Sequence, residues 1–341
     1  MKVMFGVQTE GQGHTIQAIS VKQFLTDKGY EIGKIFAAKK HKGFSDFFKS
    51  EFDIYEYTGF DFFFDDKGKL IVLKTFVQNI LKFPALIKAF VNICKTIKSE
   101  KPDIICNFYD PLVGLTAFFF PKIKYISFGH QYAMTTKHYP ETKGFFIQKI
   151  FLRLINYITS IKAQKVALSY YFFENKDVIV CPPILREETY VKSEKEDDFI
   201  LAYIMNEDLL PNLFFYAPHY ANEIHVYTKL TKKHERVPKN IRLYNLDGKV
   251  FQEKMKTCLA VICSGGFETS SEAIYHKKPL LIVPIENHYE QHANCKDAAI
   301  HGFANWNTNF DLKNIPPTQI GNEKWFDESK NILTKIFSQV A

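Results

Sequence analysis

The sequence predicts an α/β protein built from two Rossmann-like domains. Apolar runs of strand length alternate with helical segments along the chain, which is typical of parallel sheets covered by helices on both faces. A glycine-rich turn follows the first apolar run, and a second glycine-rich turn follows an apolar run late in the chain. With 341 residues, of which 46% are hydrophobic, the chain is long enough for two cores.

Breaks in this alternation give the expected domain boundaries. We expect a first domain at 1–180 and a second at 189–321, because Cys181-Pro182-Pro183 interrupts the pattern and charged residues follow. Residues 322–341 have a helical pattern of their own.

In the first half, a buried strand at 2–8 leads through a turn at 9–14 into a helix at 15–28, which ends at Gly29. The later elements are identified by the same apolar patterns, and a proline interrupts one of the helices. They are a helix near 41–49, a helix over 71–98 broken at Pro84, a helix at 144–164, and strands at 30–37, 52–57, 102–107, 124–128 and 166–172.

The second half repeats the alternation of strand and helix. Its expected strands are at 199–205, 223–228, 241–244, 259–262 and 278–284. Its expected helices are at 208–216, 250–257, 269–275 and 322–337.

The turn after the strand at 259–262 is the most informative motif. It contains Gly265 and Gly266, which permit a sharp turn and the close approach of a ligand to the backbone. The helix N-terminus that follows offers N–H groups and a positive dipole to an anion such as a diphosphate. Glu272, one turn further, is placed to hold a ribose diol. The alternative is a capped helix, because Thr269 and Glu272 have the spacing of a capping box.

Polar residues also follow the next strand, which ends at Pro284. Glu290, Gln291 and Asn294 come after it, at the carboxyl edge of the expected sheet. Ligands of open α/β sheets bind at that edge. The two polar segments are therefore expected to form one site.

The N-terminal turn, Gly11-Gln12-Gly13-His14, argues against a dinucleotide site. The third glycine of the dinucleotide fingerprint is missing, and no acidic residue ends the strand at 30–37. NAD is therefore not expected as a cofactor.

The block from Cys263 to Asn294, together with the turn at His14, resembles the GT-B glycosyltransferases. The similar branches are the UDP-glucuronosyltransferase-like and plant-type enzymes and the N-acetylglucosaminyltransferase that makes lipid II. The resemblance covers most of the chain in element order. It implies two Rossmann-like domains facing a cleft, with a C-terminal helix, here 322–341, that crosses back to the first domain.

The resemblance also implies a donor site for a nucleotide-sugar. In the family a Gly-Gly turn meets the diphosphate, a helix Glu binds ribose, and a polar pair holds the sugar hydroxyls. Ser264 stands where plant-type enzymes have a phosphate-binding His, so a UDP-sugar is expected and a thymidine diphosphate sugar is the alternative. The expected donor residues are Ser264, Gly265, Gly266, Phe267, Glu268, Thr269, Glu272, Glu290, Gln291 and Asn294.

In the plant-type branch the His of the first turn is the general base, which implies this role for His14. We expect Asp110 to be its acidic partner, with a turn residue before Pro111 as the alternative. The alternative for His14 is a helix residue satisfied by backbone groups. A His-containing turn in the lipid II enzyme places further residues on the acceptor side, which here comprises Gly11, Gln12, Gly13, His130 and Gln131.

These residues predict a metal-independent transfer of a sugar. The family analogy implies that the transfer inverts the anomeric centre. No Asp-x-Asp motif occurs, and no His or Cys spacing indicates a metal site, so neither a metal nor a cofactor is expected. Two other functions remain open, a nucleotide-sugar 2-epimerase of the same fold and a non-catalytic nucleotide-sugar-binding protein.

Charge and cysteine usage bear on partners and location. Residues 1–175 carry 24 basic and 15 acidic residues, whereas the remainder carries 20 and 22. With basic amphipathic segments at 70–98 and 145–165, and with Phe62-Phe63-Phe64 and Phe118-Phe119-Phe120, this suggests an anionic membrane surface and a lipid-linked acceptor. The alternative, slightly favoured, is ordinary solvation of helices in an enzyme with a small-molecule acceptor.

Nucleic acid is not expected as a partner, since no RNA-binding signature occurs. The six cysteines are scattered, which is typical of reduced thiols in the cytoplasm. The sequence has no signal peptide pattern and no apolar run of membrane-spanning length. We therefore expect a cytoplasmic protein. The alternative is a cytoplasmic protein that binds peripherally to the inner face of the membrane.

Overall fold

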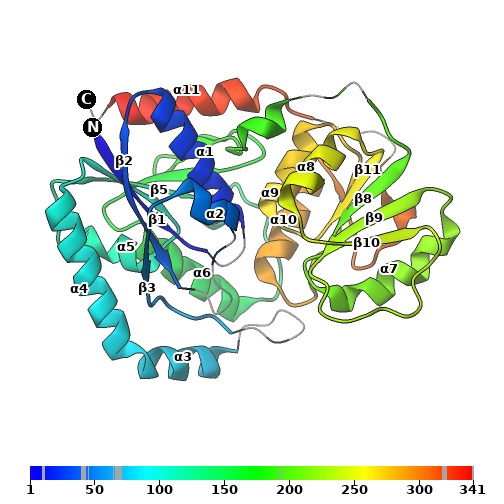
Figure 1. Cartoon of the computed structure of the whole chain (residues 1–341), viewed down its shortest axis with the longest axis horizontal. Coiled ribbons are helices and arrows are strands. Elements are labelled where there is room, and N and C mark those ends of the chain that lie inside the picture. The colour runs from blue at the N-terminus through cyan, green and yellow to red at the C-terminus, as the bar shows by residue number, and fades with distance from the viewer. Residues whose placement is uncertain are drawn as a thin grey trace. The chain divides into compact units, whose positions relative to one another are not determined.

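A computed structural model describes residues 1–9, 12–39, 44, 46–63, 65, 71–191, 193, 195–316 and 321–339. The chain divides into two compact units, each with its own parallel sheet (Figure 1). Unit 1 comprises Met1–Tyr139, Gly144–Arg186 and Asp327–Ala341, and unit 2 comprises Pro140–Lys143 and Glu187–Phe326.

The sheet of unit 1 has seven strands in the order β3-β2-β1-β4-β5-β6-β7, and every pairing is parallel. The order reverses between β1 and β4, which defines the switch point of a doubly wound sheet. The strands are β1 (Lys2–Val7), β2 (Glu31–Ala38), β3 (Ile54–Tyr57), β4 (Ile104–Phe108), β5 (Lys124–Gly129), β6 (Gln164–Leu168) and β7 (Ile179–Cys181).

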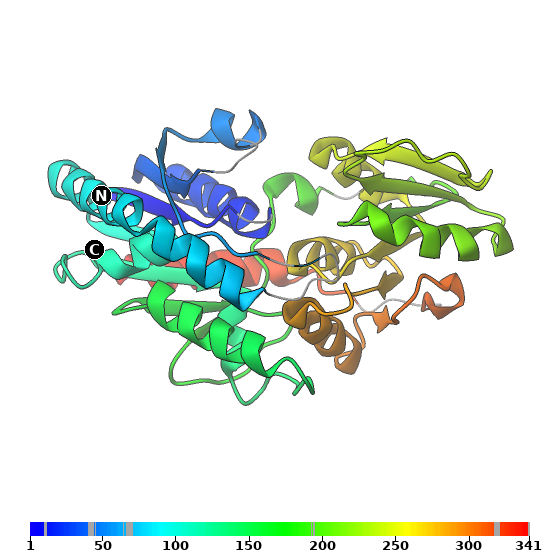
Figure 2. The ribbon, with the colours of Figure 1, turned by 90° about the horizontal axis from the view of Figure 1, so that it is seen from below.

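Helices cover both faces of this sheet (Figure 2). Successive strand residues point to opposite sides, so the apolar side chains of both faces pack against helices. Met4 packs with residues of α4 and α5, whereas Phe5 contacts Phe52 and Phe108 on the other side. The helices are α1 (Gly13–Asp27), α2 (Asp46–Glu51), α3 (Val72–Leu81), α4 (Phe83–Glu100), α5 (Pro111–Thr116), α6 (Phe146–Thr159) and α11 (Trp325–Ser338).

The C-terminal helix α11 lies beside α1 (Figure 1). The Phe337 ring contacts the rings of Phe24 and Tyr30, at centroid distances of 6.4 and 5.9 Å. The Lys124 ammonium also donates to the Ile336 carbonyl at 3.2 Å. The last segment of the chain therefore contributes to the packing of unit 1.

The sheet of unit 2 has six parallel strands in the order β10-β9-β8-β11-β12-β13, with its switch point between β8 and β11. Its strands are β8 (Phe199–Tyr203), β9 (Glu223–Thr228), β10 (Ile241–Asn245), β11 (Ala260–Cys263), β12 (Leu280–Ile282) and β13 (Asn305–Trp306). Its helices are α7 (Leu210–Tyr216), α8 (Gly248–Thr257), α9 (Phe267–Tyr275) and α10 (Tyr289–Ile300).

Most expected elements are present, and the comparison with the expected elements is instructive. The helix expected over 71–98 is divided into α3 and α4 just before Pro84, as predicted. Ile179–Cys181, where the first domain was expected to end, forms the additional strand β7, which pairs with β6 and which local sequence does not reveal. The helices α5 and α10 and the strand β13 were not expected, and residues 41–43 and 45 of the helix expected near 41–49 lie outside the described residues.

Within the described part of the chain, every helix is too short or too polar to serve as a membrane span.

Candidate active site

The glycine-rich turn of unit 2 lies at the switch point of its sheet. Ser264 follows β11 and Met205 follows β8, the two strands between which the strand order reverses. The Met205 N–H donates to the buried Ser264 hydroxyl at 3.2 Å, which ties the two strand ends together. Sheets of this type bind ligands at this point.

The two glycines of this turn have different surroundings. A Cβ on Gly265 would lie 2.7 Å from the Gln291 carbonyl oxygen and 2.9 Å from its Cα, so Gly265 is required by packing against α10. The Asn294 amide fixes this contact by donating to the Gly265 carbonyl at 2.9 Å. Among the described residues, a Cβ on Gly266 would meet the Ser264 carbonyl alone, 4.0 Å away. Gly266 therefore adjoins open space.

Gly266 is the N-cap of α9, and as a glycine it has no side chain with which to cap the helix. The helix begins at Phe267, two residues earlier than expected, so Thr269 and Glu272 both lie inside it. The capping-box interpretation of these two residues is therefore wrong. The first N–H groups of a helix have no partner within it, so this N-terminus can accept an anion.

Phe267 and Glu268 are buried in the first turn of α9, and Thr269 is partly exposed there. The acidic Glu268 side chain is placed favourably with respect to the helix dipole.

Glu272, the expected ribose ligand, is 3% exposed and belongs to a polar cluster. Its Oε1 atom lies 3.5 Å from the Thr189 hydroxyl and 3.4 Å from the Gln252 amide nitrogen. Gln252 also donates to Thr189 at 2.6 Å. Sequence analysis identified neither Gln252 nor Thr189, because they come from α8 and from the segment after β7, far from the glycine-rich turn in the chain.

The polar residues of α10 mainly hold the turn that precedes it. The Gln291 side-chain oxygen accepts from the Ile285 N–H at 2.9 Å, and the side chain is 3% exposed. His288 is the N-cap of α10, and burial lowers its pKa to about 4. Glu290 is partly exposed in the first turn. Contact of Glu290 and Gln291 with a sugar therefore stays a prediction.

In unit 1, three residues meet at the switch point of the sheet. Sequence analysis predicted two of them, His14 and Gln131, as site residues, and it did not identify the third, Tyr109. His14 follows β1, Tyr109 follows β4 and Gln131 follows β5. The His14 and Tyr109 rings are stacked at 5.2 Å with an interplanar angle of 16°. The Gln131 amide nitrogen lies 3.4 Å from His14 Nε2.

The hydrogen bonds of His14 assign its tautomer. Its Nδ1 atom lies 3.3 Å from the Gln17 side-chain oxygen, which only accepts, so Nδ1 carries the proton. The lone pair is then on Nε2, where the Gln131 amide donates to it. Burial lowers the pKa of His14 to about 4, so the ring is neutral at physiological pH.

Tyr109 and Asn156 support this arrangement, and sequence analysis missed both. Tyr109 has a φ of 64°, an uncommon conformation for a non-glycine residue. Its hydroxyl donates to Asn156 at 2.6 Å, and Asn156 donates to the Gln131 carbonyl at 2.8 Å. The position of Tyr109 directly after a strand was an available signal, whereas Asn156 on α6 offered none.

Asp110 does not form the expected pair with His14. Its carboxylate accepts from the Tyr57 hydroxyl and, at 3.0 Å, from the Val113 N–H as the N-cap of α5. Burial raises the pKa of Asp110 to about 6. The alternative role as a turn residue before Pro111 describes its contacts better.

His130, expected on the acceptor side, is buried inside unit 1. It is 1% exposed, and its ring nitrogens contact the Leu168 carbonyl at 2.8 Å and the Tyr139 hydroxyl at 3.1 Å. Burial and these contacts hold it inside unit 1. Gln12 is exposed as the N-cap of α1 and Gly13 is partly exposed, while Gly11 lies outside the described residues.

Among the described residues, no cluster of three or more His, Cys, Asp or Glu side chains has a geometry that could hold a metal ion.

A model of glycosyl transferase family 1 matches residues 1–321. The chain belongs to this family. It is a glycosyltransferase, which sets aside the epimerase and the non-catalytic protein as alternatives.

Solved structures show the same GT-B fold as this glycosyltransferase. SnogD from Streptomyces nogalater is 14% identical with a TM-score of 0.63, covering 100% of this chain and 99% of that one. The spinosyn rhamnosyltransferase SpnG, solved with thymidine diphosphate, is 12% identical with a TM-score of 0.59, covering 100% and 94%. MurG of Acinetobacter baumannii is 15% identical with a TM-score of 0.52, covering 99% and 90%. No curated protein sequence matches the chain.

Proposed function

We propose that this glycosyltransferase moves a sugar from a nucleoside diphosphate sugar, bound by unit 2, to an acceptor hydroxyl whose proton is taken by His14. The observation that carries the proposal is the N-terminus of α9, where the N-cap residue is Gly266 and the space beside it is open. This is a ready site for a diphosphate at the switch point of a doubly wound sheet.

The donor site stabilises the leaving group. The N–H groups of the first turn of α9 donate to the diphosphate as negative charge builds on it, with no proton transfer required. Glu272 accepts from the ribose hydroxyls, and Gln252 and Thr189 position its carboxylate. Glu290 and Gln291 bind the transferred sugar.

UDP is the expected nucleotide and thymidine diphosphate is the alternative. A carboxylate that accepts from two ribose hydroxyls favours UDP, because thymidine diphosphate has only the 3′-hydroxyl. Ser264 in place of a His leaves the alternative open, and two similar structures, SpnG and VinC, contain thymidine diphosphate.

The transfer step uses the lone pair of His14 Nε2. The acceptor oxygen attacks the anomeric carbon as the bond from that carbon to the diphosphate oxygen breaks, and the bonding electrons leave with the diphosphate. The acceptor hydroxyl takes the place of the Gln131 amide as the hydrogen-bond donor to Nε2, and its proton then passes to Nε2. Attack opposite the leaving group inverts the anomeric centre. We expect a hydroxyl on a hydrophobic or lipid-linked acceptor.

Calorimetric titration of the full chain with UDP, thymidine diphosphate, UMP and UDP-sugars tests the donor site. UDP should bind at least tenfold more tightly than UMP, which lacks the second phosphate. If the two bind equally, the diphosphate does not contact the N-terminus of α9. Mass spectrometry of reactions with candidate acceptors then tests transfer separately, and His14→Ala should lower product formation roughly 10²-fold while UDP still binds.

A further inference from the structure

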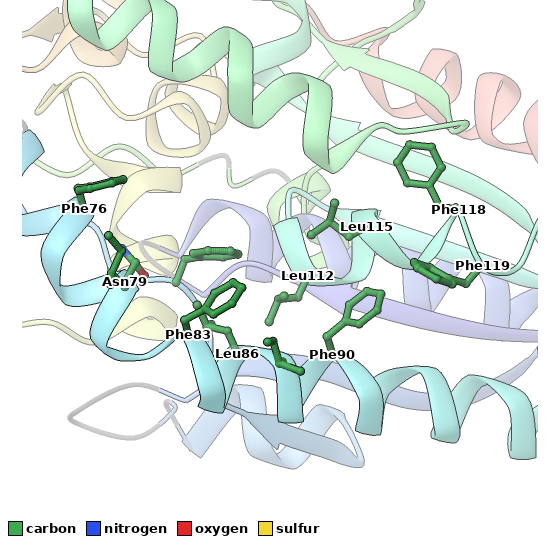
Figure 3. Close-up of a pocket in the computed structure, with 12 residues that line it drawn as sticks. Phe76, Asn79, Phe83, Leu86, Phe90, Leu112, Leu115, Phe118 and Phe119 are labelled. Atoms are coloured by element: carbon green, nitrogen blue, oxygen red, sulfur yellow. The ribbon is translucent and has the colours of Figure 1, made fainter.

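Unit 1 contains an apolar cavity of about 480 Å³ between α3, α4, α5 and the turn after α5 (Figure 3). Of the described residues that line it, eleven are apolar and one, Asn79, is polar. Leu86 and Leu112 are buried in it, at 4% exposure each. Phe76 and Phe119, which also line it, are 62% and 65% exposed. The cavity therefore has a buried apolar floor and exposed aromatic side chains around it.

The apolar surface continues beyond the cavity along α3 and α6. α3 exposes large side chains on most of its length, namely Val72, Leu73, Phe76, Val77, Ile80 and Leu81. α6 does the same with Phe146, Ile147, Ile150, Leu154 and Tyr157. α5 packs against both α4 and α6, and the Phe62 ring contacts the Phe151 ring of α6 at 5.2 Å, so the two exposed regions are neighbours. We call α3, α4, α6 and Phe118–Phe119 the apolar face.

An exposed apolar surface of this extent is rare on a monomer that meets only water. Two residues of the expected apolar segments, Phe64 and Leu70, lie outside the described residues. The described residues alone already make the face larger than scattered surface Leu or Phe residues would.

Charge on the same helices identifies what covers the face. α3, α4 and α6 carry six basic side chains, which are Lys74, Lys88, Lys95, Lys98, Lys149 and Arg153. Their one acidic side chain, Glu100, is paired with Lys2. A basic apolar helix surface is typical of contact with an anionic membrane. A second copy of the chain would instead bring two surfaces of the same sign together.

We propose that the apolar face docks on an anionic lipid bilayer and that a lipid acyl chain enters the cavity. The exposed side chains of α3, α4 and α6 lie in the interface, and the basic side chains contact the headgroups. The proposal does not depend on the donor site, because it requires neither nucleotide binding nor turnover.

Flotation of the full chain with vesicles tests docking directly. Vesicles of phosphatidylcholine and phosphatidylglycerol in a ratio of about 7:3 should carry the protein at low salt, and pure phosphatidylcholine vesicles should carry much less. Binding should fall as salt is raised, because each basic residue near the surface contributes about fivefold to partitioning. Absence of binding to the anionic vesicles at low salt would overturn the proposal.

Entry of an acyl chain has a fluorescence signature. Both native tryptophans, Trp306 and Trp325, belong to unit 2, so Phe83→Trp places a reporter in the cavity. Lipids brominated along their acyl chains should quench this reporter strongly and the native tryptophans weakly. Equal quenching in the wild type and the variant would show adsorption without entry, and the cavity assignment would be wrong.

Matched variants test whether vesicle binding depends on the apolar face or on nonspecific adsorption. Phe76→Ser with Phe119→Ser should lower partitioning about tenfold or more, whereas Phe215→Ser, 70% exposed on α7 of unit 2, should leave it unchanged. Lys88→Glu should weaken binding, and Lys233→Glu in unit 2 should not. UDP binding and thermal unfolding report that each variant is folded.

The same variants distinguish the other occupants. If the wild type forms a dimer that Phe76→Ser with Phe119→Ser dissolves, and vesicles do not compete with the dimer, a second copy covers the face. If the double variant binds vesicles like the wild type, the cavity is not part of the docking surface. Either result would overturn the proposal.

Discussion

Gly265 and Gly266 adjoin in the sequence, yet the same substitution should affect them differently. In Gly265→Ala, the new Cβ would lie 2.7 Å from the Gln291 carbonyl oxygen, 2.8 Å from its Cβ and 2.9 Å from its Cα. These atoms belong to the α10 backbone or adjoin it, so relief requires a shift of the helix. Overpacking of this kind costs about 1–3 kcal/mol, and the reduced entropy of the unfolded chain returns only about 0.4–1 kcal/mol.

In Gly266→Ala, the new Cβ would meet the Ser264 carbonyl at 4.0 Å. Gly266 has φ −77° and ψ 137°, which alanine adopts without strain. The free energy of unfolding should therefore stay the same or rise by up to about 1 kcal/mol. The methyl group would occupy the open space beside the N-terminus of α9, where we place the diphosphate. UDP affinity should fall about tenfold or more, which is about 1.4 kcal/mol.

Urea denaturation of both variants and calorimetric titration with UDP measure these two effects. The expected pattern is a destabilised Gly265→Ala and a stable Gly266→Ala with weakened UDP binding. A Gly266→Ala variant with wild-type UDP affinity would refute the placement of the diphosphate. A Gly265→Ala variant as stable as the wild type would refute the packing argument.

Four further predictions concern single side chains. Glu272→Ala should weaken UDP binding by about 1.5–3 kcal/mol through loss of a charged hydrogen bond to ribose, and equal UDP affinity in calorimetry would remove this role. His14→Ala should lower turnover by roughly 10²-fold with UDP affinity nearly unchanged, as measured by steady-state rates. The pKa of His14 is about 4 in the folded state and about 6.5 in the unfolded state. The contribution of the neutral ring to stability is therefore complete above pH 6.5 and is lost as the pH falls toward 4. In urea titrations at pH 5, His14→Gln should reduce this acid loss of stability by roughly 2 kcal/mol. The pKa of Asp110 is about 6 in the folded state, above its unfolded value, so the stability contributed by the protonated carboxyl is present at low pH and is lost as the pH rises through 6. Asp110→Asn should keep the helix cap, and its free energy of unfolding relative to the wild type should be roughly 1–2 kcal/mol higher at pH 8 than at pH 5, as measured by urea titration. The pH profile of activity should stay unchanged.

The sequence by itself determined the fold class and the general location of both polar centres. Apolar runs such as those of β1 and β11 are long and regular enough to mark buried parallel strands, and Gly-Gly or Gly-x-Gly after a strand marks a turn that few other residues form. Both features are local, so they are visible without knowledge of what packs against them.

Only the tertiary structure decided which side chains meet. The partners of His14 and Glu272 come from other elements, such as Gln131 after β5 and Gln252 on α8. The sequence placed Asp110 near its strand end correctly, but it could not show that Tyr57, from a strand three positions away in the sheet, holds the carboxylate instead of His14. A hydrogen bond depends on distances of a few tenths of an ångström between residues far apart in the chain, and local patterns carry no information about those distances.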